Sequence, residues 1–141
     1  MTNSEQQATD LYQLGREAAQ RHEVEKAVEL FRRSIEFGPH FKTLELLGEL
    51  LLESQGPSSE AVVLLAAAAG LGIKQSRPLF LLATALARRG QINDALETLD
   101  RAIEIQPNYK RALELREELK AKLQTDYTKS DPEGQCPPAS T

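Results

Sequence analysis

Three similar eight-residue segments decide the fold of this chain: residues 11–18 read LYQLGREA, residues 44–51 read LELLGELL, and residues 79–86 read LFLLATAL. Each is followed by a segment that begins with alanine, namely AVELF at residues 27–31, AVVLL at 61–65 and ALETL at 95–99. The first and third copies lie 68 residues apart, which is twice 34, and the middle copy starts 33 residues after the first. The chain therefore contains three tandem repeats.

The spacing of apolar residues inside each repeat predicts two helices. Leucine and phenylalanine recur every three or four residues, which places them on one helix face. Gly15, Gly48 and Ala83 occupy the same place in the three copies, and residues this small let two helices approach closely. The one-residue change of spacing in the middle copy falls within residues 53–58, where we expect the turn between its two helices.

This pattern resembles the tetratricopeptide-repeat (TPR) family, whose unit is a 34-residue helix–turn–helix. The alanine that opens each second segment stands where the family places its second-helix alanine. Pro39 and Pro107 match the proline that ends each unit, and the middle copy has Ile73 there, with Gly70 and Gly72 able to end its helix instead. The resemblance implies an all-α fold, a right-handed α-solenoid of three units with a C-terminal capping helix.

The same register sets the expected boundaries. We expect residues 8–40, 41–75 and 76–109 to form the three repeats, after residues 1–7 that either begin the first helix or are disordered. Residues 110–123 carry an apolar stripe but place Arg116 and Glu117 where a fourth repeat would bury residues, so they are predicted to be the capping helix. Residues 124–141 are polar and contain proline and glycine, which predicts a disordered tail.

Composition excludes several classes of function. The net charge of −4 comes with interspersed signs and no basic stripe, which argues against nucleic-acid binding. Cys136 is the only cysteine and cannot form an internal disulfide. No apolar run approaches the roughly 20 residues of a membrane span, and a cytoplasmic location is predicted. His22 and His40 lie in expected turns, and no catalytic, metal or cofactor motif is found. We expect no enzyme and no cofactor.

In the family, the first helices of successive repeats line a concave groove. Carried over onto this sequence, the predicted groove residues are Tyr12, Arg16, Lys42, Leu46, Glu49, Arg77, Phe80, Leu81 and Arg88. The set mixes apolar anchors with arginines, which suits a peptide or helix. With Arg111 it counts five cations against Glu45 and Glu49, which favours an acidic and apolar ligand. The alternative is that these are ordinary solvated helix residues.

One TPR subclass clamps the C-terminal carboxylate of Hsp70 or Hsp90 with lysine, asparagine and arginine at fixed groove positions. The corresponding positions here hold Tyr12, Arg16, Leu46, Arg77 and Leu81. Only Arg77 matches well, so clamp binding is not expected.

A second candidate surface is the outward side of the second helix in the middle repeat. Repeats one and three place charged residues there, namely Glu29, Arg32, Arg33 and Glu36, and Glu97, Asp100, Arg101 and Glu104. The middle repeat has Val63, Ala66, Ala67 and Gly70. An exposed apolar patch commonly marks an interface. We interpret it as a convex contact surface for a partner, a second copy or the chain's own N-terminal segment; the alternative is that alanine is tolerated on any helix surface.

The leading prediction is thus a protein–protein interaction module, an adaptor or co-chaperone-like protein that binds a peptide or helix segment of a partner protein in the concave groove. The alternative is a structural subunit that self-associates or docks into a larger assembly through the convex face of the second repeat.

Overall fold

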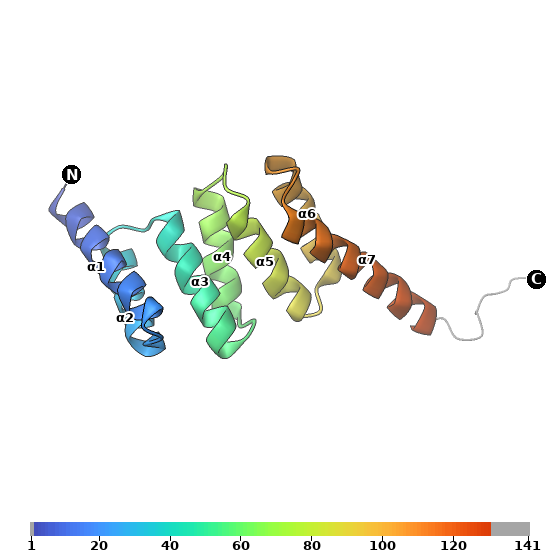
Figure 1. Ribbon diagram of the computed structural model, residues 1–141, viewed down its shortest axis with the longest axis horizontal. Coiled ribbons are helices and arrows are strands. Elements are labelled where there is room, and N and C mark those ends of the chain that lie inside the picture. Colours follow the sequence, from blue (N-terminus) through green and yellow to red (C-terminus); the bar gives the residue numbers. More distant parts are fainter. Residues whose placement is uncertain (1, 131–141) are drawn as a thin grey trace, which may run out of the picture.

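The computed structural model describes residues 2–130, which form seven helices and no strand. The helices are α1 (Asn3–Gln20), α2 (Val24–Phe37), α3 (Phe41–Gln55), α4 (Ser59–Leu71), α5 (Arg77–Arg88), α6 (Ile92–Ile105) and α7 (Lys110–Ser130). They stack side by side along one axis, with the chain starting at one end and α7 leaving at the other (Figure 1). The predicted all-α repeat solenoid is confirmed.

Short polar residues start several of the helices. Thr2 and Glu5 form a reciprocal capping box at the start of α1, and the Ser58 hydroxyl accepts the backbone N–H of Ala61 at the start of α4. The His40 ring accepts the backbone N–H of Lys42 at the start of α3. These caps satisfy N–H groups that have no partner within a helix, and α1 beginning at Asn3 resolves the expectation for residues 1–7 in favour of a helix start.

Close helix contact inside each repeat depends on the small residue predicted from the sequence. A Cβ atom placed on Gly15 would lie 2.7 Å from the ring of Phe31 on α2, and one placed on Gly48 would lie 2.7 Å from Leu65 on α4. Both partners are fully enclosed core residues. The alanine that opens the second segment of each repeat is also buried, so each pair of helices packs with no room for a larger residue.

Contacts between repeats explain why equivalent leucines differ in exposure. Leu47 and Leu82 are 1% and 8% exposed, because each lies against the repeat before it. Leu14 occupies the same position in α1, the first helix of the stack, and is 50% exposed. The core is therefore continuous along the array and ends at α1 on one side and at Ala112 and Leu119 of α7 on the other.

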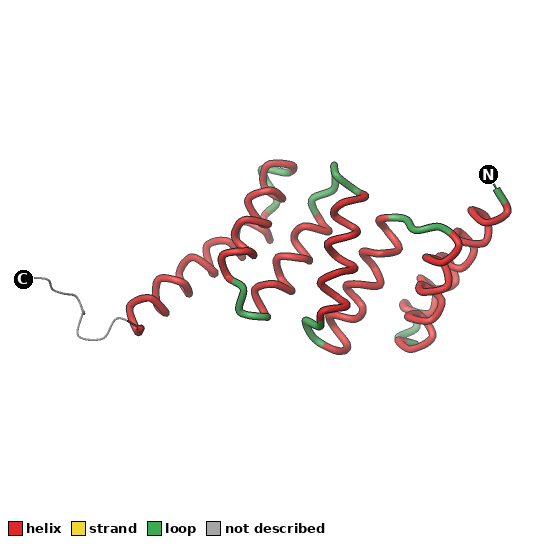
Figure 2. The backbone as a smooth tube through the Cα atoms, turned by 180° about the vertical axis from the view of Figure 1, so that it is seen from behind, coloured by secondary structure: helices red, strands yellow, loops and turns green. Residues whose placement is uncertain are grey.

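The capping helix is longer than predicted. It runs to Ser130 rather than to residue 123, and its second half projects beyond the stack (Figure 2). The low apolar content after Leu123 argues against packing of this segment but not against its being helical. No glycine or proline occurs between Leu123 and Pro132 to end the helix. The assignment of residues 124–130 to a disordered tail was wrong. The rest of that predicted tail, residues 131–141 with Cys136, lies outside the described residues.

Candidate groove on the inner face

The predicted groove residues lie on one surface, formed by α1, α3, α5 and the first half of α7, which we call the inner face. Three hollows follow one another along it. The first, of about 470 Å³, is lined by Tyr12 and Lys42. The second, of about 390 Å³, is lined by Arg16, Leu46 and Glu49. The third, of about 360 Å³, adjoins it at Glu49 and is lined by residues that include Phe80, Leu81 and Arg88.

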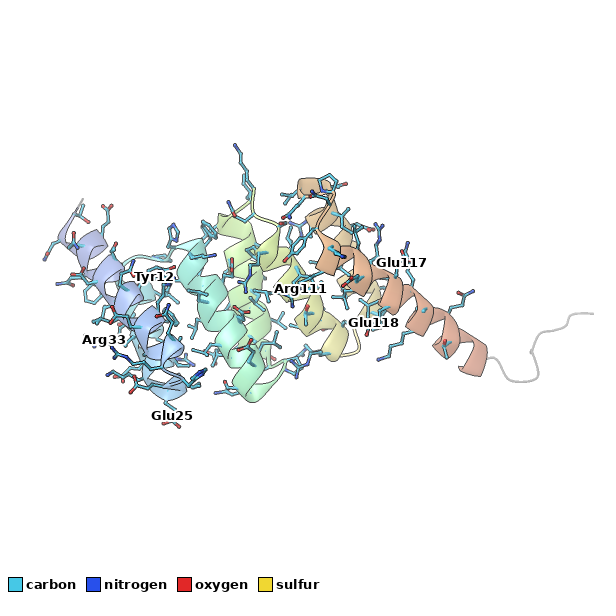
Figure 3. The ribbon with its side chains drawn as sticks, viewed as in Figure 1. Tyr12, Glu25, Arg33, Arg111, Glu117 and Glu118 are labelled. Atoms are coloured by element: carbon cyan, nitrogen blue, oxygen red, sulfur yellow. The ribbon has the colours of Figure 1, made fainter. Side chains whose placement is uncertain are left out.

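The third hollow lies where α3, α5 and α7 meet. Its apolar lining comes from all three helices and consists of Leu52, Phe80, Leu81 and Leu115. Its charged lining consists of Glu49, Glu53, Arg88, Arg111, Glu114 and Glu118. Figure 3 shows Arg111 and Glu118 on α7. An apolar floor with a charged border is the usual composition of a site for a protein segment.

A cluster of charged side chains lies at the centre of the inner face. Arg77 of α5 donates hydrogen bonds to Glu45 and Glu49 of α3, the latter at 2.8 Å between Nη2 and Oε2. The ammonium of Lys42 lies 3.5 Å from the same oxygen of Glu45. Glu45 is only 1% exposed. Burial alone would lower the pKa of Arg77, but the carboxylates of Glu49 and Glu45 raise it overall, so the arginine stays charged and holds the second repeat to the third.

This cluster corrects two predictions. Arg77 was expected to bind a ligand carboxylate, but it already binds two carboxylates of the protein. Glu45 was counted as a groove residue but is enclosed beneath Arg77. The reason is that an acid on one repeat and a base on the next meet across the interface, and the spacing within a single repeat does not show that contact.

Phe80 and Leu81 were predicted as apolar anchors of the groove, and both side chains are buried in the folded chain. The ring of Tyr109 lies 5.4 Å from that of Phe80, and the Arg111 guanidinium carbon lies 4.8 Å from the Phe80 ring centre. Burial raises the pKa of Tyr109 against the opposing effect of Arg77 and Arg111, so its hydroxyl stays protonated. The segment entering α7 therefore covers Phe80, which is 6% exposed where it lines the hollow.

Lys42, Arg77 and Arg111 occupy the same place at the start of three successive inner helices. Arg77 contacts Glu45 of the preceding repeat, and Arg111 contacts Phe80 of the preceding repeat. Lys42 lines a hollow together with Tyr12 of the preceding repeat. Arg77 and Arg111 thus pack against the repeat before them, a structural role where ligand binding was predicted, whereas the ammonium of Lys42 lies near Glu45 of its own helix.

The side chains that remain exposed are fewer and more evenly charged than predicted. Arg16 lies over the ring of Tyr12, with 5.9 Å between the guanidinium carbon and the ring centre, and is exposed, as is Arg88. Glu53, Glu114 and Glu118 line the hollows and were not in the predicted set. The excess of cations on which the prediction of an acidic ligand rested is therefore absent. Glu114 and Glu118 stand three and seven residues after Arg111 on α7, a helical spacing that could have placed them on the same face.

Comparison with known proteins agrees with this geometry. A family model described as the Fis1 C-terminal tetratricopeptide repeat matches residues 78–128. The second TPR domain of human RPAP3, solved with an HSP70 peptide, is 21% identical with a TM-score of 0.78, covering 84% of this chain and 98% of that one. The chain has the fold of a tetratricopeptide-repeat array, and its residues 78–128 match a model of that family.

Other solved TPR structures share the arrangement. The first TPR of Spaghetti (RPAP3), bound to an HSP90 peptide, gives a TM-score of 0.80 at 14% identity and covers 84% of this chain and 94% of that one. The Sgt2 TPR domain from Aspergillus fumigatus gives 0.77 at 21% identity, over 95% of this chain and 87% of that one. The search of curated proteins found no match.

The second predicted surface of this TPR array is also exposed. Val63, Ala66, Ala67 and Gly70 of α4 are all open to solvent, and Val63 is 64% exposed. Ile73, in the turn after α4, is 72% exposed and was missed as part of this surface. It stands where repeats one and three have proline, so the signal was present in the sequence but was interpreted only as a departure from the repeat.

The described residues show no arrangement for metal chemistry: residues 2–130 contain no group of three or more histidine, cysteine, aspartate or glutamate side chains placed to hold an ion. Within the same range, no helix is both long enough and apolar enough to cross a membrane. Within the described residues, the two candidate binding surfaces are the hollows of the inner face and the apolar face of α4.

Proposed function

We propose that this TPR array is a non-catalytic protein-interaction module that binds a peptide or helix segment of a partner protein in the groove of its inner face. The observation that carries this proposal is the third hollow, where apolar side chains from α3, α5 and α7 meet beneath a border of charges. Its volume of about 360 Å³ accommodates one or two large side chains of a bound segment. An adaptor or co-chaperone-like role would use such a groove, and the predicted cytoplasmic location stays a prediction.

The charges of the border define the partner. Arg16, Arg88 and Arg111 are exposed there, and so are Glu53, Glu114 and Glu118. A segment with an apolar side chain flanked by both signs of charge complements this border better than a purely acidic one. The solved RPAP3 domains that resemble the chain were bound to HSP90 and HSP70 peptides, but here Arg77 is held by two glutamates and Leu81 is buried. We therefore propose a partner other than a chaperone C-terminus.

Site-specific photo-crosslinking tests the groove directly. Thr84 lines the third hollow, and its hydroxyl bonds only the carbonyl of Phe80 in its own helix, so a benzophenone side chain is tolerated there. We expect crosslinks from position 84 to one or a few partner segments in a lysate of the native cell. The matched control places the same group at Glu97 on the opposite side of the repeat, where we expect no crosslink to those partners. Equal crosslinking from both positions would refute the groove.

A charge variant gives an independent test. Arg88→Glu changes an exposed residue of the hollow, and Arg101→Glu makes the same change on the exposed side of α6. We expect the first variant to weaken binding of the crosslinked segment about tenfold and the second to leave it unchanged. Arg77→Glu and Phe80→Ser are unsuitable for this test, because both residues hold the fold together.

A further inference from the structure

The apolar side of α4 remains without a partner in the folded chain. We call it the α4 face and define it by Val63, Ala66, Ala67, Gly70 and Ile73, all of which are exposed. Tolerance of alanine on a helix surface explains two of these residues. It does not explain Val63 and Ile73, which have the largest exposed fractions among the large apolar side chains of the described residues. This face points away from the groove, since α4 lies behind α3 and α5 when the inner face is viewed (Figure 1).

We propose that the α4 face binds a second copy of itself, with the two α4 helices antiparallel about a two-fold axis between Ala66 and Ala67. In this register Val63 of one copy lies opposite Gly70 of the other. A Cβ atom added at Gly70 would meet nothing within 4 Å, so the surface there is open to receive a side chain. The two alanines at the centre let the helix backbones approach closely.

Charge at the two ends of α4 fits the same register. Glu60 lies in the first turn of the helix and Lys74 follows its end. In an antiparallel pair the Glu60 of each copy approaches the Lys74 of the other, whereas in a parallel pair like charges would meet. Arg32 binds Glu60 at 2.5 Å from the neighbouring α2, and both side chains of that pair remain accessible. The projecting residue, the open position and the two opposite charges therefore all lie on α4 or in the turn that follows it, and this makes the surface complementary to itself.

A self-complementary surface favours a copy of the chain over an unrelated protein. A symmetric pair needs each feature and its complement on the same patch, and the α4 face provides both Val63 and Gly70. Outward residues of α2 and α6 are charged and gain nothing from burial, so the contact is confined to the central helix. A contact made by a single helix of each copy buries less surface than a standard protein–protein interface, which predicts a weak dimer. It leaves both grooves open and would let two grooves bind one bivalent partner.

Sedimentation velocity on the full chain tests this proposal, over concentrations from about 1 to about 500 µM. We expect a reversible monomer–dimer equilibrium. Val63→Glu buries a charge in the contact, and Gly70→Gln fills the open position with a good helix former. Both variants should weaken dimerisation at least tenfold while leaving the folded monomer intact. The matched control is Glu104→Gln, the equivalent change in the third repeat, which should leave the dimer as it is.

An exchange of charges tests the register. Glu60→Lys should weaken the dimer, and adding Lys74→Glu to it should restore most of the loss. A chain that stays monomeric over the whole concentration range would overturn the proposal, as would a dimer unaffected by both Val63→Glu and Gly70→Gln. A monomer whose partner protein is lost with Val63→Glu would also overturn it, because the α4 face would then belong to a different protein.

Discussion

The three outer helices α2, α4 and α6 agree on their buried side and differ on their exposed side. On the buried side, each has an alanine in its first turn and a large apolar residue four positions later, namely Phe31, Leu65 and Leu99. On the exposed side, α2 and α6 carry charges where α4 has Val63, Ala66, Ala67 and Gly70. The fold needs only the buried positions, and all three repeats supply them. The fold therefore does not require the exposed residues of α4, which agrees with the contact proposed above.

The largest effect expected within α4 separates these two sides. Leu65→Ala should lower the free energy of unfolding by about 2–5 kcal/mol, because it leaves a cavity in the core. Val63→Ala, only two residues away, should change it by less than about 0.5 kcal/mol, because Val63 is exposed. Urea unfolding at low micromolar concentration, where a weak dimer is dissociated, measures both. Comparable losses would mean that the fold itself requires Val63.

The buried sides can be compared by replacing the Gly15–Phe31 contact of the first repeat with the equivalent pair of the third repeat. Gly15→Ala should destabilise the chain by about 1–3 kcal/mol, because the new methyl group would overlap the ring of Phe31. The third repeat pairs Ala83 with Leu99 at the same place. The double variant Gly15→Ala and Phe31→Leu recreates that pair in the first repeat.

This double variant should be more stable than the sum of its single variants predicts, by about 1 kcal/mol, when all four proteins are compared in urea unfolding. Strictly additive losses would show that the repeats do not use the position in the same way.

The sequence was sufficient for the fold because each repeat restates the same buried pattern. A glycine facing Phe31 or Leu65 and an alanine in the first turn of each outer helix can be recognised from spacing alone. The exposed α4 face could also be predicted, since it required only comparison of equivalent positions. These features depend on contacts within one repeat, which are local in the sequence.

The groove was predicted less well because its side chains meet across repeats. The enclosure of Glu45 depends on Arg77, some thirty positions later, and that of Phe80 depends on Tyr109 and Arg111 at the start of α7. Periodicity shows which face a residue occupies but not what the next repeat places over it. Arginine at the same place in α5 and α7 was the available signal, because Arg77 and Arg111 both contact the repeat before them.

Two arginine–glutamate pairs that join neighbouring repeats provide a smaller effect. Arg77 binds the buried Glu45, whereas Arg32 binds Glu60 with both side chains open to solvent. Arg77→Met should lower the free energy of unfolding by about 1–2 kcal/mol, since it leaves a buried carboxylate with only Lys42 nearby; the partial exposure of Arg77 keeps the loss below that of a fully buried pair. Arg32→Met should cost less than about 0.5 kcal/mol. If Glu45→Gln does not reduce the loss caused by Arg77→Met, the charge is not its origin.

The smallest effect concerns the turn inside the first repeat. His22 has a φ of 62° and Gly90 a φ of 84° in the equivalent turn of the third repeat. Both turns make the same closing bond at 2.9 Å, from Glu23 N–H to the Ala18 carbonyl and from Gln91 N–H to the Leu86 carbonyl. A side chain in this left-handed region is strained, and glycine is not.

His22→Gly should therefore raise the free energy of unfolding by about 0.5–1 kcal/mol, the strain relieved being partly offset by the greater freedom of glycine in the unfolded chain. The reciprocal change Gly90→His should lower it by a similar amount, and both are measured by urea unfolding. Because His22 also lines the second hollow of the inner face, a binding assay on the stabilised variant separates its two possible uses. Higher stability together with weaker partner binding would show that the strained residue is kept for the groove, whereas unchanged stability would contradict the strain.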